Sequence, residues 1–407
     1  MIRWTEGLGG SVPSVPPLVT DAQRRARLVE RHRLDRTAES VDDLVQSLFA
    51  LHSSDPISPF LSTWARVSGF TRDDLEQALY RQRSLWRLHA MRRTLFVVRR
   101  DDAALFDGAV GRAIADRERA RLHGWLRTGG SDEAARRRLS TLEEALMAEL
   151  SDGRPRRTTE LSQAVPGLQE AITVGSGKWS GKTPVSSRLL LVLAMDLKIV
   201  RAEPAGTWRS SQYHWATADA WFDEPVEDLD PDAARDQLLT RYLMRFGPAT
   251  SLDIRWWTGW TARRTTAAVE STGAEPVELE DGSTGWVVAG DVQFPSRQKS
   301  SVTLLPGLDS TPMGWKERSW FLGGHKAPLF DRNGNIGPTI WVDGRIVGGW
   351  GQRPGGEVAT QLLEPVSGPA EKAVSSRAAE LTKWLEGATA TPRFPTPLQK
   401  ELGTGRW

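Results

Sequence analysis

Apolar residues recur every three or four positions after residue 40, and this spacing predicts an amphipathic helix. Val41 and Leu48 lie on its apolar face, and Ser40 and Asp43 are spaced as an N-terminal capping box. His52 follows Leu48 by four residues. The same periodicity therefore predicts His52 in the last helical turn, pointing toward the interior or a cleft.

A second helix is predicted directly after the first. Asp55 is placed to cap it, Pro56 suits its first position, and Trp64 continues its apolar face. His52 and Ser54 would then flank a polar corner between two helices. A helix C-terminus stabilises a charged imidazolium by a few tenths to about 2 kcal/mol. Equally, a histidine on an apolar face is often a plain core residue, and Ser54 is also explained as a capping hydroxyl.

Helices followed by a two-stranded ribbon occur three times along the chain, which is the plan of a winged helix. In the first unit a helix over 71–80 precedes two strands within 84–100. In the second, helices beginning at 158 or 159 and at 184 precede a strand over 198–202 and a returning strand. The hairpin tips are the expected wings.

A long charged helix over 102–127 leads from the first unit to the second, and the third unit is a shorter copy of the same plan. Its helices are expected over 233–245, 250–258 and 261–272. A hairpin that turns at Asp281-Gly282 follows them.

From residue 294 onward strands prevail. Strands are expected within 301–309 and 357–365, with a hairpin on Asp343-Gly344 between them and a closing amphipathic helix over 369–386. We therefore expect an α+β fold of three tandem winged-helix domains followed by a C-terminal β-barrel-like domain. The expected domain bounds are 1–130, with the polar corner, then 131–224, 225–292 and 293–407.

Composition narrows the function without fixing it. The 407 residues include no cysteine, which excludes disulfides, thiolate-bound zinc and a cysteine nucleophile. We expect a cytoplasmic protein, because no apolar run is long enough to span a membrane and no signal sequence is evident. The net charge is only +2, so nucleic-acid binding has to rest on local clusters of charge.

One such cluster stands between residues 81 and 100, which include seven arginines and no acidic residue. Guanidinium groups in this number suit contact with DNA phosphates. For the arginines of a basic helix near residues 20–34, phosphate or solvent contact is left open. The residues that we expect to contact DNA are Arg87, Arg92, Arg93, Ser187, Arg188, Arg209, Arg297, Lys299 and Arg318.

Five stretches, in this order, resemble one family. They are LHSSDPISPFLSTWARV, ALYRQRSLWRLHAMRRTLFVV, WWTGWTARRTTAAV, LLPGLDSTPMGWKERS and WVDGRIVGGW. Together they resemble the AlkZ/YcaQ-like winged-helix DNA glycosylases of bacteria, over about residues 24–386. The resemblance implies hydrolysis of the N-glycosidic bond of a damaged purine in double-stranded DNA, by a protein associated with the nucleoid. Three DNA-binding units in one chain favour a monomer.

At the corner this family carries Gln-x-Gln or Gln-x-Asp before Asp-Pro, and these side chains are thought to hold the attacking water and support the sugar cation. Here His52 and Ser54 occupy those positions, directly before Asp55. An N7-alkylated purine is already cationic and leaves readily. A neutral lesion such as hypoxanthine would benefit from a general acid, which a charged His52 could supply. A neutral His52 could instead accept a proton from the water that Ser54 fixes, and the sequence leaves both roles open.

Glycosidic cleavage passes through an oxocarbenium-like sugar, so a carboxylate near that sugar would help. Asp309 and Asp55 are the candidates, although Asp309 is also explained as a turn residue paired with Arg318. No lysine falls in the matched corner, so we expect hydrolysis without a Schiff base. We expect no cofactor, and the six histidines show no metal-binding spacing. The rival hypothesis is a non-catalytic winged-helix regulator or damage sensor.

Overall fold

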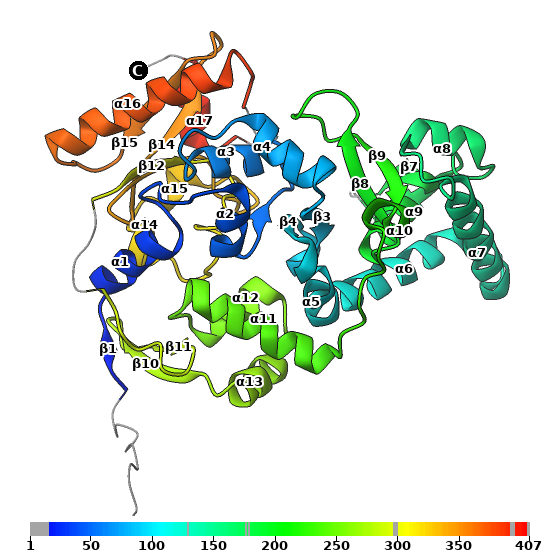
Figure 1. Ribbon diagram of the computed structural model, residues 1–407, viewed down its shortest axis with the longest axis horizontal. Coiled ribbons are helices and arrows are strands. Elements are labelled where there is room, and N and C mark those ends of the chain that lie inside the picture. Colours follow the sequence, from blue (N-terminus) through cyan, green and yellow to red (C-terminus); the bar gives the residue numbers. More distant parts are fainter. Residues whose placement is uncertain are drawn as a thin grey trace, which may run out of the picture.

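The first unit joins short helices to a three-stranded sheet. A computed structural model describes residues 16–127, 130–175, 177, 180–295, 300–390 and 395–404. The chain begins with β1 (Leu18–Val19) and α1 (Asp21–Arg31). The first unit then contains α2 (Val41–Leu48), β2 (Leu51–His52), α3 (Ser58–Trp64), α4 (Arg72–Glu76) with a π-helical continuation (Gln77–Arg81), β3 (Leu85–His89) and β4 (Leu95–Arg99). Its sheet has the order β2-β4-β3 (Figure 1).

The corner after α2 differs from the prediction. Ser40 caps α2 as expected, with its hydroxyl accepting from the Asp43 amide. The helix ends at Leu48, because Phe49 adopts a left-handed φ of 64° and packs its ring against Phe106 at 4.8 Å. His52 therefore lies in β2, paired with Phe96 of β4, and not in a helical turn. The argument for a charged imidazole at a helix C-terminus is wrong.

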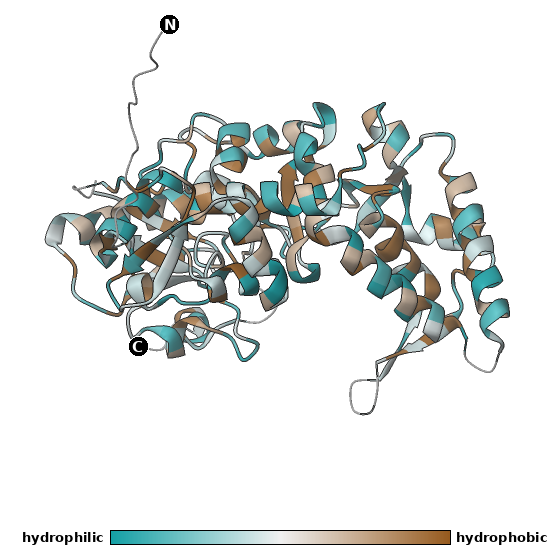
Figure 2. Ribbon diagram, turned by 90° about the horizontal axis from the view of Figure 1, so that it is seen from below, coloured by the Kyte–Doolittle hydropathy of each residue, from teal (hydrophilic) through white to brown (hydrophobic). Residues whose placement is uncertain are grey.

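The second unit has a hydrophobic core of its own. The connecting helix runs through α5 (Ala103–Phe106), a π-helical turn (Asp107–Gly111) and α6 (Arg112–Leu126). Then follow α7 (Asp132–Glu149), β5 (Arg156–Arg157), α8 (Thr158–Ala164), β6 (Ala171–Val174), β7 (Gly181–Pro184), α9 (Val185–Met195), β8 (Ile199–Pro204), β9 (Tyr213–Thr217) and α10 (Ala218–Phe222). Leu126, Leu146 and Leu189 belong to this separate core. Figures 1 and 2 both place the unit at one end of the longest axis.

The third unit confirms its predicted helices and hairpin. It contains α11 (Pro231–Phe246), α12 (Ser251–Thr258), α13 (Ala262–Ser271), β10 (Glu275–Leu279) and β11 (Thr284–Val287). β1 adds to β10 in parallel, and Ala249 forms a bridge with Trp286 on the other side.

The C-terminal part is one antiparallel sheet in the order β12-β13-β14-β15. Its elements are β12 (Val302–Leu305), α14 (Ser319–Leu322), α15 (Lys326–Leu329), β13 (Thr339–Val342), β14 (Arg345–Gln352), β15 (Val358–Leu362), α16 (Gly368–Leu385) and α17 (Pro397–Thr404). Among the described strands β12 and β15 are edges, so the expected barrel is an open sheet, and α16 contacts both edges.

The first unit, the third unit and the C-terminal sheet share one hydrophobic core. Tyr242 of α11 packs against Trp257 of α12 at 4.7 Å between ring centroids, and Trp384 of α16 stacks on Phe70 at 5.9 Å. The α+β class is confirmed, and segments hundreds of residues apart in the sequence become one body. None of the described helices has the length and apolarity needed to cross a membrane.

Candidate active site

A cavity of about 540 Å³ opens beside the corner. Its volume falls in the range of small-molecule sites. Three parts of the chain line it: the first unit, the tip of the β8–β9 hairpin and the C-terminal part. Residues in its lining include His52, Ser54, Asp55, Thr94, Arg209, Ser211, Leu308, Asp331, Asn335 and Gln399.

His52 is held at the cavity by its backbone. Its amide donates to the Ser310 hydroxyl at 3.0 Å, and that hydroxyl donates to the Ala50 carbonyl at 2.6 Å. His52 is 4% exposed, and its ring meets Phe96 edge-on at 5.4 Å. Burial, followed by repulsion from Arg92, lowers the pKa of His52 to about 3, against a weaker opposing effect of Asp309. The imidazole is therefore neutral near pH 7, and its buried Nδ1 has no hydrogen-bond partner among the described residues.

Ser54 and Asp55 lie at the mouth of the same cavity. Ser54 is exposed, and its hydroxyl accepts only a long hydrogen bond of 3.4 Å from the Leu95 amide. Asp55 accepts from the Ile57 amide at 3.3 Å, just before α3 begins at Ser58 instead of the expected Pro56. Burial raises the pKa of Asp55, with the Ile57 hydrogen bond opposing the rise.

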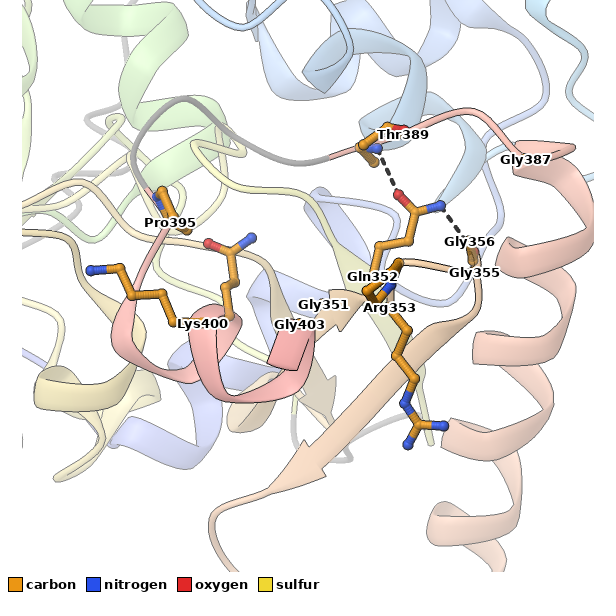
Figure 3. A pocket seen from close by; sticks show the side chains of 13 residues that line it. Gly351, Gln352, Arg353, Gly355, Gly356, Gly387, Thr389, Pro395, Lys400 and Gly403 are labelled. Carbon is orange, nitrogen blue, oxygen red and sulfur yellow. Dashed lines mark hydrogen bonds between the residues drawn. The ribbon is translucent and has the colours of Figure 1, made fainter. Parts of the chain in front are cut away.

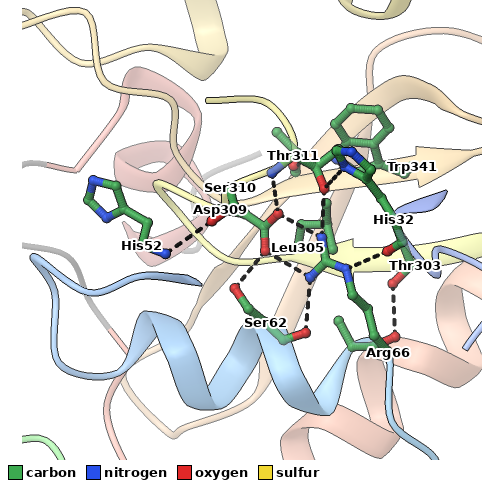
Figure 4. Close-up of polar contacts among 12 residues, drawn as sticks. His32, His52, Ser62, Arg66, Thr303, Leu305, Asp309, Ser310, Thr311 and Trp341 are labelled. Carbon is green, nitrogen blue, oxygen red and sulfur yellow. Dashed lines mark hydrogen bonds and ion pairs between the residues drawn. The ribbon is translucent and has the colours of Figure 1, made fainter. Parts of the chain in front are cut away.

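Asp309 is part of a buried ion pair and does not line the cavity. Its carboxylate accepts from Arg66 at 2.7 and 2.9 Å, from the Ser62 hydroxyl at 2.6 Å and from the Thr311 amide at 2.9 Å (Figure 4). Burial would raise the pKa of Asp309, but Arg66 and the other donors outweigh it and hold the pKa below its ordinary value. The expected pairing with Arg318 is wrong, since Arg66 is the partner.

His32 completes the network around this ion pair. Its Nε2 faces the Arg245 carbonyl at 3.1 Å, so Nε2 carries the hydrogen and Nδ1 accepts from the Thr311 hydroxyl at 2.9 Å. Arg66 in turn donates to the His32 carbonyl and to the Thr311 hydroxyl. The network thus ties α1, α3 and α11 to the loop that carries Ser310.

The sequence reasoning missed the acidic turn on the C-terminal side of the cavity. Asp331 accepts from the amides of Asn333 and Asn335, at 2.8 and 2.9 Å, and from the Asn335 side chain at 2.9 Å. Burial would raise the pKa of Asp331, but these hydrogen bonds hold it below its ordinary value, so the carboxylate is ionised. The segment DRNGN is a recognisable turn, although nothing local places it opposite His52.

A neighbouring cavity of about 400 Å³ is shown in Figure 3. Glycines of the β14–β15 turn and Lys400 of α17 line it. It shares Ala390 and Gln399 with the cavity at His52, so the two form adjoining hollows.

The expected DNA-contacting residues of the first unit differ in accessibility. Arg87 is 3% exposed and donates to the hydroxyls of Ser53 and Tyr80, both at 2.9 Å, so it faces the interior and is removed from the set. Arg92 and Arg93 are exposed at the β3–β4 tip, and Arg93 pairs with Glu118 at 3.0 Å.

The remaining expected contacts lie on other units. Ser187 and Arg209 are exposed, while Arg188 and Arg318 are half-buried. Arg297 and Lys299 lie outside the described residues. Phosphate or solvent contact was left open for the arginines of α1. Arg24 and Arg27 are buried, so neither alternative holds for these two.

Chemically, the cavity offers neutral hydrogen-bonding groups and an ionised carboxylate. No group of three metal-ligating side chains is found within the described ranges.

Comparisons with known proteins bear on the family and the fold of the chain. The family model described as DNA glycosylase AlkZ-like matches residues 45–384. Among solved structures, the chain is similar to the DNA glycosylase AlkZ of Streptomyces sahachiroi, with a TM-score of 0.68 and 18% identity over 93% of this chain and 98% of that chain. At this identity the likeness shows the fold alone. No curated protein matches the chain.

Proposed function

The chain belongs to the AlkZ-like DNA glycosylase family, and from this premise we propose that its substrate is a damaged purine in double-stranded DNA, foremost an N7-alkylated purine. The observation that carries the proposal is the neutral, buried His52 beside a cavity that also contains Ser54. The rival hypothesis of a non-catalytic regulator gives way to an enzyme because the family is one of glycosylases.

The state of His52 favours a substrate whose base leaves without help. A general acid works best with a pKa near the working pH. The pKa of His52 is about 3, so it holds no proton to give to a neutral base such as hypoxanthine. An N7-alkylated purine already carries the positive charge that protonation would supply. His52 would instead accept a hydrogen bond from the attacking water, with the Ser54 hydroxyl fixing the water's orientation.

An ionised carboxylate would stabilise the sugar cation as the base departs. Asp309 has its oxygens occupied by Arg66, Ser62 and Thr311, so we assign it a positioning role through Ser310. Asp331 lines the cavity and is ionised, which makes it the stronger candidate, with Asp55 as the second.

DNA binding by three winged helices and a monomer remains our proposal. What supports it is the recurring order of a helix, a short strand or bridge, two helices and a hairpin in all three units. Leu126 of α6 packs in the second core, which favours grouping this helix with the second unit instead of ending the first at residue 130. The proposed DNA contacts are Arg92, Arg93, Ser187, Arg188, Arg209 and Arg318.

Single-turnover incubation with duplexes containing N7-methylguanine, 3-methyladenine, hypoxanthine or undamaged purines, followed by alkaline cleavage, tests the proposal. We expect release of N7-methylguanine, and His52→Ala should slow it by about 10²-fold or more while DNA affinity stays within about twofold. His52→Gln, which restores a hydrogen-bonding amide, is the matched variant and should retain more activity. Faster release of hypoxanthine than of N7-methylguanine would contradict the assigned substrate class.

A further inference from the structure

Three side chains from distant parts of the chain meet near His52. The Arg92 guanidinium carbon lies 3.9 Å from the centroid of the Trp256 ring, and that of Arg318 lies 4.7 Å from the same centroid. Arg92 comes from the β3–β4 tip, Trp256 from α12 and Arg318 from the loop before α14. Trp256 is half-buried, unlike the neighbouring Trp257, so part of its indole surface is left for ligand or solvent.

The two guanidiniums of this Arg92–Trp256–Arg318 cluster lack carboxylate partners. Within the described part of the chain, no Asp or Glu oxygen lies within 4.0 Å of either one. Among the described residues the one hydrogen-bond acceptor of Arg318 is the Met313 sulfur at 3.8 Å; its guanidinium also faces the Phe330 ring at 5.5 Å, and its buried Nε has no acceptor. Burial, followed by repulsion from Arg92, lowers the pKa of Arg318 to about 10, and burial lowers the pKa of Arg92 to about 10, so both groups stay charged at neutral pH.

Other arginines of the same hairpin, Arg93 at its tip and Arg99 and Arg100 at the far end of β4, are paired with carboxylates, unlike Arg92. Arg93 pairs with Glu118 at 3.0 Å, Arg99 with Asp101 at 3.1 Å and Arg100 with Glu224 at 2.6 Å. Asp253 is the carboxylate that favours charge on Arg318, but it accepts from the backbone amides of residues 250, 316 and 317. Two converging cations without a counter-ion are costly unless an anion joins them.

The tip is also pre-set for this arrangement. Arg92 and Arg93 have φ values of 55° and 64°, in the left-handed region that non-glycine residues rarely adopt. Residues in this strained conformation concentrate at ligand sites.

We propose that the Arg92–Trp256–Arg318 cluster binds one backbone phosphate of the DNA substrate and thereby places the damaged nucleotide beside His52. The inference rests on the proposed function, and it assigns Trp256 as the platform that orients both guanidiniums. Their planar donor forks match the oxygens of a phosphodiester. Arg92 and His52 line one small cavity, so a phosphate held by Arg92 lies next to the residue that handles the water.

Binding to a duplex with a non-cleavable lesion analogue, measured by fluorescence anisotropy over a range of salt concentrations, tests the cluster. This readout needs no base release, so its failure is separate from a failure of the proposed function. Arg92→Gln and Arg318→Gln should each weaken binding about 10-fold and lower the salt slope by up to about 1. Because both hold the same phosphate, the double variant should lose about 1 in slope, not about 2.

Arg99→Gln is the matched control, since it removes the same charge at the other end of strand β4, where the guanidinium already pairs with Asp101. It should change affinity by less than about threefold. If Arg99→Gln weakens binding as much as Arg92→Gln, or if the double variant loses about 2 in slope, the single-phosphate site is wrong.

Neutral methylphosphonate links, introduced one at a time, locate the phosphate on the wild-type protein without any substitution. One position should weaken binding to wild type about 10-fold and leave binding to the double variant Arg92→Gln/Arg318→Gln unchanged. Inorganic phosphate is the second arm. A flat methylphosphonate series, together with inorganic phosphate displacing DNA better than chloride at equal ionic strength, would show a site for free phosphate and overturn the assignment to DNA.

Discussion

Two arginines bear on His52 and differ in how their hydrogen-bond donors are used. Arg66 is completely buried, and its five donors reach the His32 and Ser62 carbonyls, both Asp309 oxygens and the Thr311 hydroxyl. Arg92 is exposed and stacks on Trp256 without a carboxylate partner in the described chain. Donors that are all used inside the protein hold structure, whereas donors left open are available to a ligand.

Arg66→Gln should have the largest effect on the free energy of unfolding, because Arg66 is the buried arginine of the two. Removing one partner leaves the Asp309 charge buried and unpaired, which costs about 3–5 kcal/mol in the free energy of unfolding. Denaturant-induced unfolding measures this loss. Arg92→Gln is the counterpart from the open side and should change the free energy of unfolding by less than about 1 kcal/mol. Equal losses in the two variants would remove the distinction between them.

The free energy of unfolding, measured as the pH is lowered, distinguishes the buried histidines from the buried Asp309. The pKa values of His32 and His52 are lowered in the folded protein, so their stabilising effect is present above the ordinary value of 6.5 and is lost as pH falls below it. Each should contribute a slope of about 1.4 kcal/mol per pH unit between pH 6 and 4. Asp309, whose pKa is also lowered, should add its loss only below 3.8. His52→Gln should reduce the slope of the free energy of unfolding between pH 6 and 4 by about 1.4 kcal/mol per pH unit, the contribution of one proton. An unchanged slope would contradict the burial of a neutral His52.

Ser310→Ala should have a smaller effect on the free energy of unfolding, and it connects the buried Asp309 network with His52. It removes the hydroxyl between the Ala50 carbonyl and the His52 amide, which costs about 1–3 kcal/mol in the free energy of unfolding. Because the His52 backbone loses its anchor, kcat should fall while the dissociation constant for DNA stays unchanged. Ser310→Thr keeps the hydroxyl and should restore kcat. Loss of DNA affinity without loss of kcat would contradict a positioning role.

The sequence predicted those features that depend on neighbours within a few turns of chain. The helices α11, α12 and α13 and the hairpin at Asp281-Gly282 follow from local periodicity and turn residues. The Ser40 cap was equally local. The position of His52 was not, because β2 pairs with β4 more than forty residues later and this pairing overrides the helical pattern.

The candidate site shows the same division more sharply. His52, Ser54 and Asp55 were found as a cluster, since they are adjacent in the sequence. The partner of Asp309 was missed because Arg66 is separated from it by 243 residues, and Asp331 was missed because only the tertiary fold brings it to the cavity. Arginine-rich segments also mislead, because Arg24, Arg27 and Arg87 are as basic in the sequence as Arg92 and yet buried.

The smallest change is expected in the pH dependence of base release, which tests whether His52 titrates near neutral pH. With its pKa at about 3, His52 stays neutral from pH 5.5 to 8, so the single-turnover rate on N7-methylguanine should vary by less than about threefold over this range. A limb centred near pH 6.5 that disappears in His52→Gln would instead show an ordinary, titrating histidine. Arg92→Gln removes a charge that lowers the pKa of His52, but burial is the larger cause. Titration of His52 should therefore stay below pH 5.5 in that variant too, which would show that burial in the packed core keeps the His52 imidazole neutral and that Arg92 is not needed for it.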